Sequence, residues 1–137
     1  MAGETSQRTG ISSKVIPYEG GPCINGAPWV ASIGATQLQL NDVLEMGYLP
    51  ANSTLIGFFV YATDMDTNGA PALVSKITVG STDVATGLTT GQAAGGAFVP
   101  ISPITLTAKT LVKLTFTTAA ATAAAGTYSM TPLYVGQ

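Results

Sequence analysis

Hydrophobic and polar residues alternate with a period of two along much of the chain, which is the pattern of strands with one buried face. In the clearest run, residues 110–117, Val112, Leu114 and Phe116 alternate with polar residues. We therefore predict a half-buried strand there. Two further runs alternate in the same way and are also predicted strands: 104–109 and 37–41.

Other segments add strands of different character. Residues 53–63 are almost continuously apolar, which predicts a central strand buried on both faces. Strands are also expected over 71–79 and 127–135, and Pro132 should place the latter at a sheet edge or bend it. With Gly, Pro, Asn or Asp after each run, about eight strands result. The expected core residues are Phe58, Val60, Leu106, Val112, Leu114 and Phe116.

The predicted fold is therefore all-β: a single antiparallel β-sandwich or barrel, jelly-roll-like, with an extended N-terminal arm. Helical signals are weak. Residues 41–46 could form one turn with Asn41 as the N-cap. The alanine-rich segment 119–125 could form a short helix, but Gly126 ends it early and such short helices are marginal. We favour a hairpin connection there.

Residues 1–26 differ in composition from the domain over 27–137. They are small and polar and end in a Gly/Pro cluster, which predicts an extended arm, although an ordinary frayed terminus is the alternative. If the arm contacts another subunit, its apolar residues are the expected anchors: Ile11, Val15, Ile16 and Ile24. Trp29, at the start of the domain, is either a core anchor or an aromatic residue at a subunit contact.

The chain carries few charges: 5 basic and 7 acidic residues, against 46% hydrophobic residues. Five basic residues are too few for a nucleic-acid surface. The longest apolar run, 55–62, is about eight residues, far below the roughly 20 of a membrane-spanning helix. We expect no nucleic-acid or membrane partner. A surface so poor in charge should face other subunits, in an oligomer or a larger shell.

Histidine is absent from the sequence, and Cys23 is its one cysteine. Serine–histidine and cysteine–histidine nucleophiles and histidine metal sites are therefore excluded. With so few other titratable residues, we expect no enzymatic activity and no cofactor.

One acidic cluster has a candidate metal function. Asp64, Asp66 and Asn68 have the spacing of the first half of an EF-hand loop and could offer oxygen ligands to calcium. The second half of that loop and its flanking helices have no counterpart here. Asp, Asn and Gly are also the residues that a turn between strands requires, and we favour the turn.

Three segments together resemble a family of small structural proteins of tailed bacteriophages, the head decoration (cement) proteins. They are 60–73, the loop 90–96, and 117–127, which leads into the last strand. The resemblance covers roughly residues 36–135, and the order and spacing of the three segments carry it.

The resemblance implies a compact β protein without an active site. Such a protein is made in the host bacterial cytoplasm, binds the major capsid protein on the capsid surface, stabilises the capsid by cementing neighbouring capsomers, and is commonly a homotrimer. Two alternatives stay open. One is a head-fibre base or tail component. The other is a carbohydrate-binding β-sandwich module, which would use tyrosines and Trp29 as stacking platforms.

Overall fold

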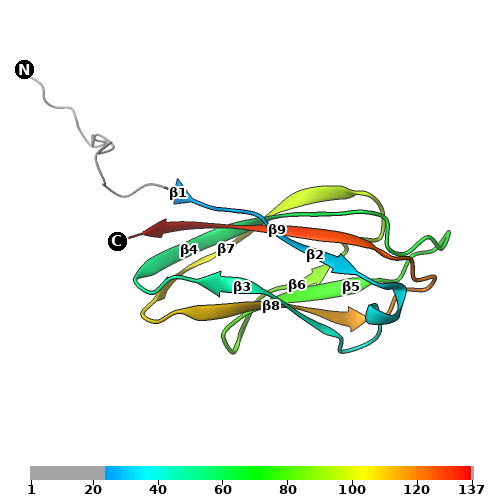
Figure 1. Cartoon of the computed structure of the whole chain (residues 1–137), viewed down its shortest axis with the longest axis horizontal. Coiled ribbons are helices and arrows are strands. Elements are labelled where there is room, and N and C mark those ends of the chain that lie inside the picture. The colour runs from blue at the N-terminus through cyan, green and yellow to red at the C-terminus, as the bar shows by residue number, and fades with distance from the viewer. Residues whose placement is uncertain (1–23, 137) are drawn as a thin grey trace, which may run out of the picture.

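Nine strands and one short 3₁₀ helix make up the part of the chain that the computed structural model describes, residues 24–136 (Figure 1). The 3₁₀ helix η1 spans Ala35–Gln37. The strands are β1 (Ile24–Asn25), β2 (Trp29–Ile33), β3 (Val43–Leu49), β4 (Ser53–Ala62), β5 (Val74–Val79), β6 (Thr82–Leu88), β7 (Gly95–Leu106), β8 (Thr110–Thr118) and β9 (Gly126–Gly136). The prediction of an all-β fold is confirmed.

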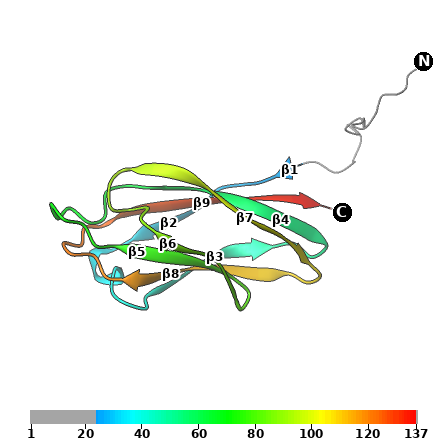
Figure 2. The same cartoon turned by 180° about the vertical axis from the view of Figure 1, so that it is seen from behind.

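The strands form two antiparallel sheets that pack face to face (Figures 1 and 2). Sheet A has the order β1-β9-β4-β7, with β2 also paired to β9, and sheet B has the order β3-β8-β5-β6. The pairs are nested along the chain: β2 with β9, β3 with β8, β4 with β7, and β5 with β6. This nested order of antiparallel pairs is that of a jelly roll. Because the strands lie in two separate sheets, the fold is a sandwich and not a closed barrel.

The core lies between the two sheets and follows the predicted alternation. All six residues expected from the period-two pattern are buried: Phe58, Val60, Leu106, Val112, Leu114 and Phe116. Further buried residues from β2, β3, β4, β5, β7 and β9 and from the loops complete it, among them Leu38, Met65 and Tyr128. Among the residues that the structure describes, no helix is long and apolar enough to cross a membrane.

The expectation that the strand over 53–63 is buried on both faces is wrong. β4 is central in sheet A, but Phe59 and Tyr61 on its outer face are 53% and 54% exposed. The reason is that residues 24–136 form two layers only, so within this part of the chain one face of each sheet has no layer above it. A continuous apolar run gives no information about which face is covered.

Two local predictions, the strand over 37–41 and the hairpin connection over 119–125, are wrong, and the helical turn considered for 41–46 does not form. Residues 37–41 form the end of η1 and a turn, and Leu38 is buried from there rather than from a strand. Residues 43–46 belong to β3 and not to a helical turn, since Asn41 has a positive φ of 67° and its N–H donates to the Phe116 carbonyl. The loop 119–125 crosses from sheet B to sheet A, because its flanking strands pair with different neighbours.

Pro132 lies inside β9, where the strand has a partner on only one side. β9 pairs with β4 throughout this region, whereas β1 pairs with residues 134–135 and β2 with 126–130. The proline, which has no N–H to donate, thus falls opposite the gap between β1 and β2. The expectation that Pro132 places this strand at a sheet edge is therefore wrong for β9 as a whole, which has neighbours on both sides and lacks one only beside the proline.

The last residues of the predicted arm, from Ile24 on, belong to the described part of the chain. Ile24 and Asn25 pair with Val135 and Tyr134 of β9, so the end of the predicted arm belongs to sheet A. Ile11, Val15 and Ile16 lie outside the described residues, and the arm stays a prediction there.

Candidate interaction surface

The few charges of the described chain are divided unequally between the two sheets. The strands of sheet A carry no charged residue over their described lengths. Each strand of sheet B carries one: Glu45 in β3, Lys76 in β5, Asp83 in β6 and Lys113 in β8. The two outer faces of the sandwich therefore differ in what they can contact.

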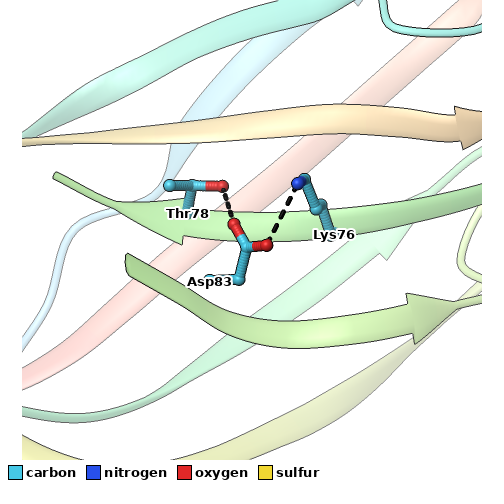
Figure 3. A network of polar contacts seen from close by, with 3 residues as sticks. All are labelled: Lys76, Thr78 and Asp83. Atoms are coloured by element: carbon cyan, nitrogen blue, oxygen red, sulfur yellow. Dashed lines mark hydrogen bonds and ion pairs between the residues drawn. The ribbon is translucent and has the colours of Figure 1, made fainter. Parts of the chain in front are cut away.

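The outer face of sheet B is a polar network (Figure 3). Lys76 Nζ lies 3.0 Å from Asp83 Oδ2, and the Thr78 hydroxyl donates to Asp83 Oδ1 at 2.9 Å. These contacts with Lys76 and Thr78 lower the pKa of the Asp83 carboxyl. Glu45 lies opposite Lys113 on the adjacent strands. Partly exposed ion pairs of this kind suit a surface that stays in water.

The outer face of sheet A combines large exposed apolar side chains with the absence of charge, whereas on sheet B the exposed Val43 and Tyr48 lie among charged residues. We call Val30, Phe59, Tyr61 and Phe98 the aromatic face; they are 66%, 53%, 54% and 47% exposed. The strand register makes them neighbours. One row across the sheet is Val30, Ser129, Tyr61 and Gly96, and the next is Thr131, Phe59 and Phe98.

The rings of the aromatic face are held against the sheet. Phe59 and Phe98 form a cross-strand pair with ring centroids 5.1 Å apart and an interplanar angle of 50°. A Cβ atom at Gly57 would lie 2.9 Å from the Phe98 ring, and one at Gly96 would lie 3.0 Å from Tyr61 Cδ2. Each ring thus covers a glycine on the neighbouring strand, which gives a preordered apolar surface. A shallow hollow of ≈ 390 Å³ adjoins the rings.

Trp29, an interface candidate from the sequence, does not belong to the aromatic face. Trp29 is half-buried at the opposite side of sheet A, and a Cβ atom at Gly47 in β3 would lie 2.5 Å from its ring. Trp29 therefore packs between the two sheets, as a core anchor would. For Ile24 the structure gives the backbone pairing with β9 alone.

The acidic cluster at the end of the sandwich forms a structural junction. The Asp66 carboxylate is 1% exposed and accepts backbone hydrogen bonds from both loops that meet there. Oδ2 accepts from the N–H groups of Ala72, Leu73 and Ala121 at 2.7, 3.1 and 2.9 Å. Oδ1 accepts from Thr122 N–H at 2.9 Å and from Asn68 N–H at 3.4 Å.

These donors also set the ionisation of Asp66. Burial alone raises the pKa of this carboxyl, but the backbone hydrogen bonds from Thr122, Ala72, Ala121 and Leu73 outweigh burial. The pKa of Asp66 is consequently well below its ordinary value of 3.8. Asp66 holds the 64–73 loop to the 119–125 loop as an anion.

This geometry bears on the calcium hypothesis. Backbone N–H groups already surround both Asp66 oxygens, whereas a calcium ligand must turn its oxygen lone pairs toward the cation. Asp64 Oδ1 and Asn68 Oδ1 accept from the N–H groups of Asp66 and Ala70, as in turns. Within residues 24–136, no group of three or more His, Cys, Asp or Glu side chains could hold a metal ion.

We therefore predict that chelation leaves the stability of the protein unchanged. The thermal midpoint in EDTA should match that in excess calcium within about 1 °C, since no calcium-dependent free energy is added to folding. Differential scanning fluorimetry of the metal-stripped protein measures this. A midpoint that falls by several degrees in EDTA, and recovers with calcium but not with magnesium, would contradict the prediction.

Sequence reasoning missed the aromatic face, although a signal was present. The sequence shows that the five segments that form sheet A contain no charged residue. It does not show that these segments share one sheet, so the uncharged face could not be predicted without the strand pairing. The tyrosines invoked for carbohydrate binding do not gather: Tyr128 is buried, while Tyr48 and Tyr61 lie on different sheets.

No protein-family model and no curated protein sequence matches the chain. Solved structures that share its fold include two from phage capsids. A chain from the capsid of Ralstonia phage GP4 has a TM-score of 0.71 and 19% identity, covering 90% of this chain and 92% of that one. A chain from the capsid asymmetric unit of cyanophage Pam1 has a TM-score of 0.73 and 19% identity, with 100% of both chains covered. The described part of the chain thus has the fold of a chain from a phage capsid.

Proposed function

We propose that this chain is a non-enzymatic virion structural protein that binds the outside of a phage capsid and cements neighbouring capsomers. The observation that carries the proposal is the full-length match to a capsid chain. The match covers 100% of this chain and 100% of that chain, so the likeness is not confined to one part of either. The resemblance of segments 60–73, 90–96 and 117–127 to head decoration proteins supports the same role.

The surface supports this role independently. A cement protein needs a face that can be removed from water at low cost, and the aromatic face has no charge to desolvate. The proposed partner is the major capsid protein, and the proposed location is the capsid surface after synthesis in the host cytoplasm. We extend the proposal to a homotrimer, to be tested by light scattering with and without capsids.

Binding to capsids that lack the protein is the direct test. The purified protein should co-sediment with such capsids, saturate at a fixed ratio to the major capsid protein, and raise the temperature at which the capsids open. Absence of binding to capsids, together with recovery on tails or head fibres, would support the alternative of a tail or fibre component. Absence of binding to any virion part would contradict the proposal.

The N-terminal arm supplies a second prediction for this function. Deleting residues 2–23 leaves β1 and its pairing with β9 in place, so circular dichroism and the thermal midpoint should stay close to those of the full chain. Retention on capsids should fall at least tenfold, because Ile11, Val15 and Ile16 are the expected anchors. A truncated protein that binds capsids with unchanged affinity would show that the arm is not a contact element.

A further inference from the structure

We propose that the protein binds the capsid through the aromatic face of sheet A, with the charged face of sheet B turned to the solvent. The inference rests on the proposed function and adds the orientation of the molecule on the shell. The partner of the aromatic face is an uncharged, apolar area on the outer surface of the assembled capsid protein.

The first observation in favour of this orientation is the unequal distribution of charge between the two sheets. A charge that is buried in an interface without a partner is costly, and sheet B would bring one charged residue per strand into such an interface. Lys76 and Asp83 already neutralise each other at the surface and keep part of their side chains in water. Sheet A presents no charge and only small polar side chains, such as Ser129 and Thr131, beside its rings.

The second observation concerns strand β7, which forms one edge of sheet A. β7 is an edge strand, and a partner could in principle extend the sheet by pairing with it. Pro100 and Pro103 interrupt its row of N–H groups, which is a common protection of edges against such pairing. The partner is therefore expected on the face of the sheet, over Phe59, Tyr61 and Phe98, and not along the β7 edge.

The size of the face decides between a second copy and the shell. An aromatic side chain offers roughly 150–250 Å², so three half-exposed rings amount to roughly 300 Å². A stable interface needs about 800 Å² from each partner. The aromatic face can form the centre of such an interface, but alone it is too small to hold two free copies together. A shell that adds contacts with neighbouring strands and the arm supplies the remaining area.

Two tyrosines provide a matched test of the orientation. Tyr61 on sheet A is 54% exposed and Tyr48 on sheet B is 55% exposed, so their replacement by threonine removes an equally exposed ring from opposite faces. The Tyr48 ring also has Lys109 Nζ at 4.5 Å from its centroid, a contact that Y48T removes. Y61T should weaken capsid binding at least tenfold, and Y48T should change it less than twofold. The double variant F59T/F98T should weaken binding by about a hundredfold. Circular dichroism and thermal melts of all variants establish that they are folded.

Salt provides the second readout. Binding through an uncharged face should change less than twofold between about 50 mM and 500 mM NaCl, whereas contacts made by Lys76, Asp83 or Lys113 would weaken with screening. Weaker binding of Y48T with unchanged binding of Y61T would overturn the orientation and leave the proposed function standing. Unchanged binding of all variants, or a steep salt dependence, would overturn it in the same way.

The remaining outcomes separate the two proposals. If Y61T abolishes self-association in analytical ultracentrifugation but binds capsids normally, a second copy covers the aromatic face and the inference is wrong. If the unaltered protein does not bind capsids at all, the proposed function fails and the inference fails with it.

Discussion

Replacing Asp66 by alanine is expected to lower the free energy of unfolding by roughly 3–5 kcal/mol, because it leaves at least four backbone N–H groups, one buried and three part-buried, without an acceptor. Those groups belong to Ala72, Leu73, Ala121 and Thr122, so both loops at this end of the sandwich lose their junction. The thermal midpoint should fall by about 15 °C. Urea unfolding followed by circular dichroism measures the change.

Asp64 is the matched control for this experiment. It is exposed, and its carboxylate accepts one long hydrogen bond of 3.2 Å from Asp66 N–H. Asp64→Ala should therefore cost less than about 1 kcal/mol. Equal destabilisation by the two substitutions would contradict the role assigned to Asp66.

The stabilisation by Asp66 should depend on pH in a defined direction, which a comparison of the unaltered protein with the variant Asp66→Asn measures. Because the folded-state pKa of Asp66 is lowered, the stability that its ionised form contributes is complete above the ordinary value of 3.8. That contribution is lost as the pH falls below this value toward the lowered folded-state pKa. The difference in unfolding free energy between the unaltered protein and Asp66→Asn should shrink from about pH 5 to pH 2.

Phe116→Ala is expected to cost about 3–5 kcal/mol, the amount typical of a large core side chain, whereas Phe59→Ala should cost less than about 1.5 kcal/mol. Both residues lie in strands, but Phe116 is fully buried between the sheets and Phe59 is 53% exposed on the aromatic face. Urea unfolding of the two variants tests the comparison. Similar losses for both would indicate that Phe59 serves the fold and is not free for a partner.

These two phenylalanines also show what the sequence could predict. Phe116 belongs to a run with strict alternation, so its burial followed from the pattern. Phe59 belongs to a continuous apolar run, in which the pattern does not distinguish a covered face from an open one. That distinction depends on the number of layers in the molecule, which is a property of the whole fold.

The errors at residues 37–46 have a related cause. Leu38 and Leu40 alternate with polar residues as in a strand, but Leu38 reaches the core from a turn after η1, and Leu40 is 60% exposed. Asn41 has the residue type of a helix N-cap, but it adopts a positive φ before β3, a conformation that asparagine also tolerates. Pairing of β3 with β8, about 70 residues later in the chain, outweighs these local preferences.

Asp66 shows a similar limit for the candidate site. The sequence identified its segment as a turn or half of a calcium loop, both of which use the same residue types. Four of its hydrogen-bond donors lie 6, 7, 55 and 56 residues away, and the last two come from the loop that connects the sheets. No local motif contains that information.

The most direct test of the account is the amount of this protein in purified virions, measured by quantitative mass spectrometry against the major capsid protein. A capsid-binding protein that cements capsomers should be present at a copy number close to that of the major capsid protein, and should remain with heads after tails are removed. Its absence from virions, or its presence in only a few copies that follow the tail fraction, would contradict the account.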